Sequence, residues 1–148
     1  MDSPLALVDY CFPVVQVVAN PNVEQNVEIN DIQYDAEVGL ALSEDGDVYQ
    51  VSVEISSLDP KNDEKINAYS VNLVALGHFQ VHPDWPEPEK LARINGASIL
   101  YSAAREFLIT ITSRGPWGAI SLPTKSFNTL TPIAPDQSCK ENNTEEKV

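Results

Sequence analysis

Apolar and polar residues alternate over much of the first half of the chain. From Ile32 to Leu42 every even-numbered residue is apolar, and most of the residues between them are acidic or carry an amide. A period of two residues predicts a strand with one buried face. The Asp45-Gly46 pair suits a tight turn and the alternation resumes from Tyr49 to Ile55, so we predict a hairpin.

Two further strands are predicted on either side of this hairpin. Residues 71–81 carry an apolar residue or glycine at every odd position, and residues 14–19 form a short apolar run. Pro13 precedes that run and indicates an edge strand, because proline cannot donate a hydrogen bond to a neighbouring strand. We therefore expect a four-stranded antiparallel sheet with one solvated face.

Helical spacing follows the predicted sheet. Three prolines between Pro83 and Pro88 end the last strand. Leu91 and Ile94 predict a short helical turn that stops at Asn95-Gly96. From residue 97 to 113, ending before Gly115-Pro116, apolar residues recur at spacings of three and four, as Leu100, Ala104, Phe107, Leu108 and Ile111. This pattern predicts one long helix packed on one face of the sheet, which makes the fold class α+β.

The chain length fits a single domain. With 148 residues and 43% hydrophobic residues, we expect one folded domain over residues 1–130. Residues 131–148 are polar and almost without apolar side chains, so we expect a disordered tail.

Charge and apolar content exclude several classes of partner. The net charge is −13, with 22 acidic against 9 basic residues, which disfavours binding to nucleic acid or to anionic membrane. No apolar run reaches the roughly 20 residues that cross a bilayer, and no basic residue precedes the apolar opening, so a secretory signal is not expected. Cys11 and Cys139 lie near opposite ends and indicate no disulfide framework. We expect a cytoplasmic protein.

The sequence offers little for catalysis. His78 and His82 are the only two histidines, and a third metal ligand is not evident. Neither cysteine has a base and an orienting group nearby in the sequence, and none of the phosphate-binding, zinc-protease or serine-hydrolase motifs is present. We therefore expect no catalytic residues, no metal and no cofactor, and hence no enzyme.

Residues 113–127 alternate large apolar side chains with turn formers, and two interpretations are open. Trp117, Ile120, Leu122 and Phe127 could fold down as a lid over the core, or the segment could line a groove for apolar peptide. Gly115, Pro116 and Gly118 suit an exposed bend around the tryptophan, which favours the groove.

Here the sequence resembles the SecB export-chaperone family. The resemblance rests on Ile99-Leu100-Tyr101 and Ala104-Arg105-Glu106, followed by Ser113-Arg114-Gly115, Trp117, Leu122 and Phe127. It implies a cytoplasmic, ATP-independent holdase that binds unfolded preproteins for export and assembles as a homotetramer, a dimer of dimers. It also implies the client-binding residues: Trp117, Ile120, Leu122 and Phe127, with Leu100, Tyr101 and Phe107 behind them.

Some positions depart from the family pattern. Ser102 and Ala103 stand where Pro-Tyr is usual, and Gly118 stands where a proline is usual. The acidic residues that dock the translocation ATPase in the family align with Pro13, Val17 and Asn72, so we expect this partner less than unfolded chains.

Two alternatives stay open beside general export. One is a SecB-like chaperone dedicated to a single client, such as an antitoxin. The other is an acidic interaction or inhibitor module that recognises a basic partner through residues 1–89, which hold 17 of the acidic residues.

The helix also carries a second apolar side. Ile99, Ala103 and Ile109 lie away from its main stripe, whereas a helix on a single sheet needs only one apolar face. This surplus supports burial between subunits.

Overall fold

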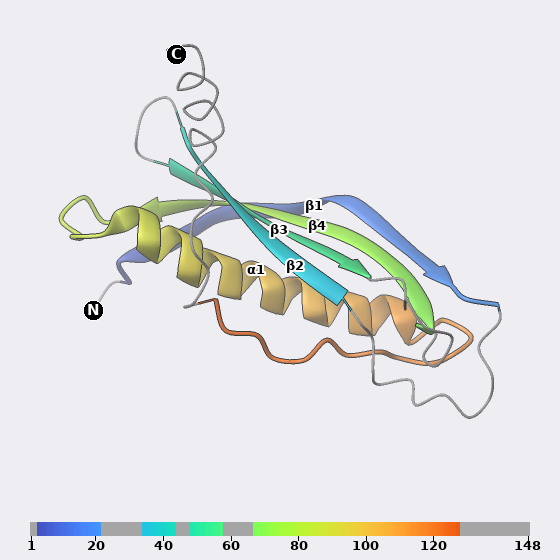
Figure 1. Ribbon diagram of the computed structural model, residues 1–148. Coiled ribbons are helices and arrows are strands. Elements are labelled where there is room, and N and C mark those ends of the chain that lie inside the picture. The colour runs from blue at the N-terminus through green and yellow to red at the C-terminus, as the bar shows by residue number, and fades with distance from the viewer. Residues whose placement is uncertain (1–2, 22–33, 44–47, 58–66, 128–148) are drawn as a thin grey trace, which may run out of the picture.

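A computed structural model describes residues 3–21, 34–43, 48–57 and 67–127 (Figure 1). Four strands and one helix follow in chain order: β1 (Leu5–Ala19), β2 (Tyr34–Leu42), β3 (Val48–Ser57), β4 (Tyr69–Val81) and α1 (Pro88–Thr112). The strands form one antiparallel sheet in the order β1-β4-β3-β2, and α1 lies across one face of it. The predicted α+β class and its four-stranded sheet are confirmed.

The β2–β3 hairpin pairs as the alternation predicts. Leu42 lies opposite Tyr49, and the Ser43 N–H donates to the Val48 carbonyl at 2.8 Å. The side chain of Ser43 also accepts a hydrogen bond from the Val48 N–H at 3.2 Å. The Asp45-Gly46 pair itself lies outside the described residues.

Strand β4 supplies much of the core. Its odd-numbered residues from Val71 to Phe79 are buried on the side of α1, which is the face that the alternation assigns. The core continues on β3 and α1, and Val51, Val53, Ile55, Ala92, Ala97, Leu100, Ala104 and Leu108 are fully buried. The helix and the two central strands therefore enclose one hydrophobic core.

Strand β1 confirms the edge position but is much longer than predicted. It begins at Leu5 rather than Val14, and Pro13 lies inside it. The register shifts between Cys11 and Val14, so the proline falls in an irregularity of the ladder where no N–H is required. A second shift lies between Leu7 and Asp9. These two shifts explain why the period of two residues is lost over the first half of the strand.

The helix corrects the predicted stop at Asn95-Gly96. α1 continues through both residues as one helix of 25 residues. Gly96 is buried, and a Cβ built on it would lie 3.1 Å from Val51 Cγ2 and 3.2 Å from Phe79 Cε2. The glycine therefore serves the close approach of helix and sheet, and it does not end the helix.

Two other expectations concern the ends of the chain. The predicted polar tail, residues 131–148, lies outside the described residues, as does Cys139. Cys11 is exposed and unpaired within the described part. None of the helices there is long and apolar enough to span a membrane.

Candidate functional site

Apolar side chains on the helix side of β1 are left uncovered by α1. Leu7, Tyr10 and Val15 pair with β4 residues on the helix side, and antiparallel partners share a face. Their exposed fractions are 40%, 51% and 44%. Because β1 is an edge strand among the described strands, this apolar row lies beside backbone groups that no other described strand pairs with.

One helix side chain contacts this row, and a second apolar side chain is exposed earlier on the helix. Phe107 is half-buried and stacks on the Phe12 ring of β1, with centroids 4.7 Å apart and an interplanar angle of 13°. Ile99, earlier on the helix, is 42% exposed. We call this region the β1–α1 surface; its members are Leu7, Tyr10, Phe12, Val15, Ile99 and Phe107.

Beyond the helix, one buried hydroxyl organises the loop of residues 113–118. The Tyr69 hydroxyl donates to the Gly118 carbonyl at 2.9 Å and accepts from the Trp117 N–H at 3.1 Å. Its ring fills the space beside Gly115, where a Cβ would collide with the Tyr69 side chain. Gly118 has a φ of 79°, a conformation that favours glycine. The start of β4 thus fixes the bend after α1.

Trp117 lies against the ends of β1 and β4. Its Nε1–H donates to the Asn20 carbonyl at 2.9 Å, and the residue is half-buried. Its side chain also packs against the hydrophobic core. The tryptophan is therefore anchored to the sheet through both its backbone and its ring.

After this bend, residues 119–127 run back along α1, and we call them the strap (Figure 1). Ile120, Leu122 and Phe127 are 1%, 2% and 2% exposed. The Ile120 N–H donates to the Thr112 hydroxyl at 2.9 Å, and that hydroxyl donates to the Leu108 carbonyl at 2.6 Å. The strap is thus fastened at the end of the helix.

Two tyrosines fasten the strap further along. The Tyr101 hydroxyl donates to the Pro123 carbonyl at 2.6 Å. Since Tyr101 has one hydroxyl proton, Tyr34 must donate in the 2.8 Å contact between the two hydroxyls. Burial, and after it the bond to Tyr34, raises the pKa of Tyr101, so this donor keeps its proton into alkaline solution. The Tyr101 ring also meets Phe127 edge-on, with centroids 5.5 Å apart.

The seven predicted client-binding side chains divide into two groups. Trp117 and Phe107 are half-buried and reach the surface. The other five are buried within the chain: Leu100, Tyr101, Ile120, Leu122 and Phe127. The interpretation as a lid therefore describes how the strap packs. Client contact by these residues stays a prediction.

The sequence reasoning missed most of the β1–α1 surface. Only Phe107 was predicted as a client contact, and Ile99 as part of an apolar surplus. Leu7 and Tyr10 went unnoticed because the register shifts in β1 interrupt the alternation there. The signal that could have found them is the density of apolar residues between Leu5 and Val18, which exceeds what an edge strand needs to bury.

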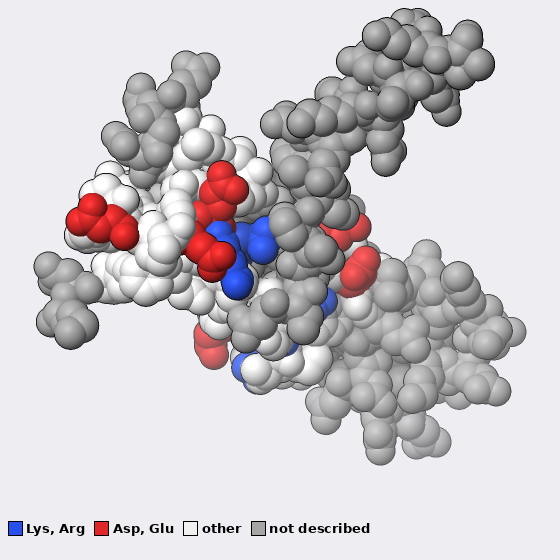
Figure 2. Space-filling model, turned by 60° about the vertical axis from the view of Figure 1, so that its left-hand side comes forward, with Lys and Arg blue, Asp and Glu red and all other residues white. Residues whose placement is uncertain are grey.

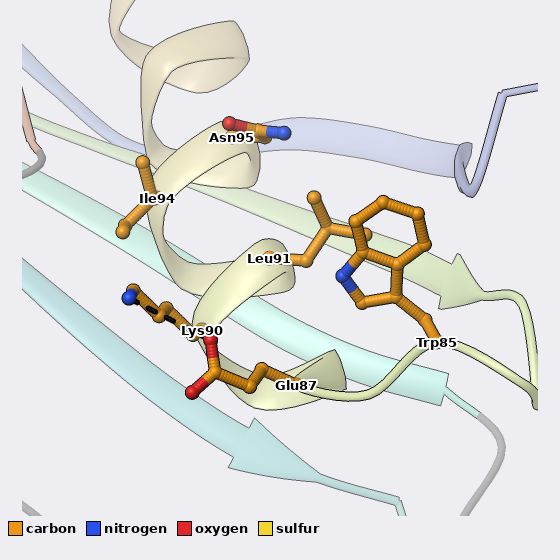
Figure 3. A pocket seen from close by; sticks show the side chains of 6 residues that line it. All are labelled: Trp85, Glu87, Lys90, Leu91, Ile94 and Asn95. Atoms are coloured by element: carbon orange, nitrogen blue, oxygen red, sulfur yellow. Dashed lines mark ion pairs between the residues drawn. The ribbon is translucent and has the colours of Figure 1, made fainter.

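A small pocket of about 260 Å³ lies at the start of α1 (Figure 3). Trp85 and Leu91 form its apolar side, and the Lys90 ammonium lies 3.6 Å from the Glu87 carboxylate at its edge. Both charged side chains are largely exposed, so this ion pair adds little stability. The pocket is separate from the seven predicted residues.

The two histidines do not converge. His78 Nδ1 lies 2.5 Å from an Asp9 carboxylate oxygen, whereas His82 Nδ1 accepts from the Asp84 N–H at 3.2 Å. Within the described ranges, no group of three side chains could hold a metal ion. Acidic and basic side chains lie close together in the centre of the face in Figure 2, so one sign of charge does not dominate it.

No family model and no curated protein matches the sequence. Among solved structures, the chain is similar to the Mycobacterium tuberculosis Rv1957 SecB-like chaperone, solved in complex with a ChAD peptide from the Rv1956 HigA1 antitoxin. The two chains are 16% identical, and the TM-score is 0.54. The match covers 88% of this chain and 94% of that chain.

This similarity extends over the sheet and the helix together, and it agrees with the strand order and the single long helix described above. It confirms the fold that the motifs between Ile99 and Phe127 imply. The chain therefore has a SecB-like fold.

Proposed function

We propose that this protein is an ATP-independent holdase that binds apolar segments of unfolded polypeptides, and that it is not an enzyme and needs no cofactor. The observation that carries the proposal is the β1–α1 surface, an exposed apolar row along an edge strand of a SecB-like fold. A monomeric protein rarely exposes so many large apolar side chains together unless they contact a partner.

An extended chain suits this surface for two physical reasons. The free edge of β1 offers backbone donors and acceptors that any polypeptide can pair with. Apolar side chains beside that edge, such as Phe12, Val15 and Phe107, can then take every second residue of the client. Trp117 lies further along the same edge, near the end of β1, and extends the proposed client region. Recognition of this kind depends little on sequence.

The other half of the surface suits self-association. Leu7, Tyr10 and Ile99 lie toward the start of α1 and are each 40% to 51% exposed. We assign them to contacts between copies of the chain, in a dimer or a dimer of dimers. Burial there would leave the half around Phe107 open to client.

The test compares matched lysine substitutions on the two edge strands. Val15→Lys places a charge in the proposed client region, and Leu42→Lys places one at a similarly exposed site on β2. Without ATP, the unaltered protein and Leu42→Lys should suppress aggregation of several denatured proteins at stoichiometric amounts, and Val15→Lys should suppress it much less. Equal suppression by both variants contradicts the assignment, and no suppression by the unaltered protein contradicts the holdase.

A second candidate is a chaperone dedicated to one client. It is favoured by the similar M. tuberculosis structure, which holds a peptide from an antitoxin. The two candidates differ in client breadth. Capture of one native partner, with no suppression of aggregation of unrelated denatured proteins, would favour the dedicated chaperone over the general one.

Two finer expectations belong to the same proposal. A role in export predicts that cytoplasmic preproteins and the translocation ATPase are captured from the native host. An acidic interaction module predicts instead a single folded, basic partner whose affinity falls steeply as salt rises, because exposed charges are screened by salt whereas apolar contacts are not.

A further inference from the structure

The strap is bound to the rest of the chain in the manner of an extended peptide ligand. Ile120 and Leu122 are buried, while Ala119, Ser121 and Pro123 beside them are exposed. This is the alternation of a strand, yet residues 119–127 belong to no strand. Within the described part of the chain, no backbone-to-backbone hydrogen bond joins them to another segment. Sheet pairing therefore does not hold the strap.

Side-chain hydroxyls take the place of the missing ladder. Thr112 accepts from the Ile120 N–H at 2.9 Å, and Tyr101 donates to the Pro123 carbonyl at 2.6 Å. Both contacts reach main-chain atoms that every polypeptide carries, with the exception that proline lacks the N–H. The strap is thus held through its backbone and through apolar side chains two residues apart, and these contacts do not depend on a particular sequence.

Contacts specific to the strap's polar side chains are weak. Arg105 Nε lies 3.4 Å from Ser121 Oγ at an exposed position. The Lys125 ammonium is 6.0 Å from the centre of the Tyr34 ring, at the outer limit of a cation–π contact. An incoming chain would lose little by lacking these two side chains.

From this geometry we infer that the strap occupies a second client-binding groove, formed by α1 and Tyr34, and that an extended apolar segment of a client displaces it. The inference rests on the proposed holdase function and adds a site to it. Exchange is feasible because a client with apolar residues two positions apart can place them where Ile120 and Leu122 lie. Its backbone can then form hydrogen bonds with the same hydroxyls of Thr112 and Tyr101. The hydrogen bonds of Tyr69 hold the chain up to the Gly118 carbonyl, so the exchange involves only residues 119–127.

Competition has a measurable consequence. If only a fraction of molecules have the groove open, the apparent dissociation constant is the intrinsic one divided by that fraction. A change that holds the strap down must weaken client binding in this groove, and a change that loosens the strap must strengthen it. If the strap instead forms only a wall of the groove, a change that loosens the strap should weaken client binding.

The first experiment locks the strap. Arg105→Cys and Ser121→Cys are combined in a chain with Cys11→Ser and Cys139→Ser, and the two new thiols are joined by a short bifunctional thiol reagent. The probe is a fluorescent peptide with the sequence of residues 119–127. We expect the locked protein to bind this peptide at least roughly tenfold more weakly than the same variant before treatment. The single variant Arg105→Cys, treated identically, controls for the reagent.

The second experiment loosens the strap. Leu122→Ser should bind the peptide roughly tenfold more tightly, with circular dichroism reporting whether the helix and sheet remain folded. Equal peptide affinity in the locked and unlocked proteins overturns the inference, even if Leu122→Ser fails to fold. Weaker binding by a folded Leu122→Ser variant overturns it as well.

A second probe distinguishes failure of the proposed function from failure of this inference. An unfolded, carboxymethylated protein serves as the second probe, because it can also bind the β1–α1 surface. If that probe binds the unlocked chain while the peptide binds the locked and unlocked proteins equally, the holdase proposal is supported and the strap groove is overturned. If neither probe binds any form, both proposals are overturned.

Discussion

The Tyr69 hydroxyl and the Trp117 backbone nitrogen lie 3.1 Å apart, although the two residues are separated by 48 positions in the chain. The same hydroxyl donates to the Gly118 carbonyl at 2.9 Å. One buried side chain at the start of β4 thus fixes the two peptide groups that flank the Trp117–Gly118 peptide bond. The direction of the strap after Gly118 depends on this arrangement.

Tyr69→Phe should lower the free energy of unfolding by about 1 to 3 kcal/mol. The phenylalanine keeps the ring in the core but leaves the Trp117 N–H and the Gly118 carbonyl without their buried partner. Chemical denaturation measures the loss. Tyr10→Phe, at a half-exposed site on β1, is the matched control and should change stability by less than about 0.5 kcal/mol. Equal effects of the two variants would contradict the role given to Tyr69.

Gly96→Ala should destabilise the protein by about 1 to 3 kcal/mol, even though alanine is the better helix former. The added methyl group would lie 3.1 Å from Val51 and 3.2 Å from Phe79, both fully buried. Helix and sheet must then move apart.

The control for this variant is Ser102→Ala on the exposed side of the same helix, where the hydroxyl donates to the Ser98 carbonyl of the same helix. That substitution should be neutral or slightly stabilising. A thermal denaturation series on both variants decides the matter. A stabilised Gly96→Ala protein would mean that the glycine does not set the helix–sheet distance.

How much of this fold the sequence reveals depends on whether a pattern is local. Alternation identifies β2, β3 and β4 because each buries one face along its length. Gly96 leads to a wrong helix end because glycine's tendency to end helices is visible locally in the sequence. Its close approach to Phe79 is not visible there, since Phe79 belongs to β4. The length of β1 is missed because two register shifts move its apolar residues from one face to the other.

The candidate site is predicted less completely than the fold, for a related reason. Leu122 and Phe127 are visible as a motif, but the sequence does not show that the Phe127 ring meets Tyr101 of α1 edge-on. The hydroxyl contacts join residues such as Tyr34 and Tyr101, which are 67 positions apart and belong to no recognisable pattern. Sequence periodicity carries no information on such pairs.

Stability should fall at alkaline pH because of Tyr101. Its pKa is raised in the folded protein, chiefly by burial, from the value of 10.0 that applies when it is exposed. A raised pKa means that the folded state holds the proton more tightly than the unfolded state. The resulting stabilisation is complete below pH 10 and is lost as the pH rises beyond it. Unfolding free energies measured from about pH 8 to about pH 11, in steps of about one pH unit, should show this fall. Tyr101→Phe should make the fall less steep.

Trp117→Ala separates anchoring from client binding at the same residue. The side chain is half-buried and its ring donates to the Asn20 carbonyl at 2.9 Å, so we expect a stability loss of about 2 to 4 kcal/mol. If Trp117 also contacts client, binding per folded molecule should weaken in addition. Thermal stability and client binding are measured on one sample. Unchanged binding by the folded fraction would remove Trp117 from the proposed client region.

Self-association should depend on the half of the β1–α1 surface around Ile99. At micromolar concentration, sedimentation should give a species larger than the 16.3 kDa chain, because apolar side chains at 40% to 51% exposure gain stability when a second copy covers them. Ile99→Asp introduces a charge that would be buried in that contact and should shift the equilibrium toward monomer. Leu42→Asp, at a comparably exposed site on β2, should leave it unchanged. A monomeric unaltered protein would refute the assembly. Equal dissociation by both variants would show that the contact lies elsewhere.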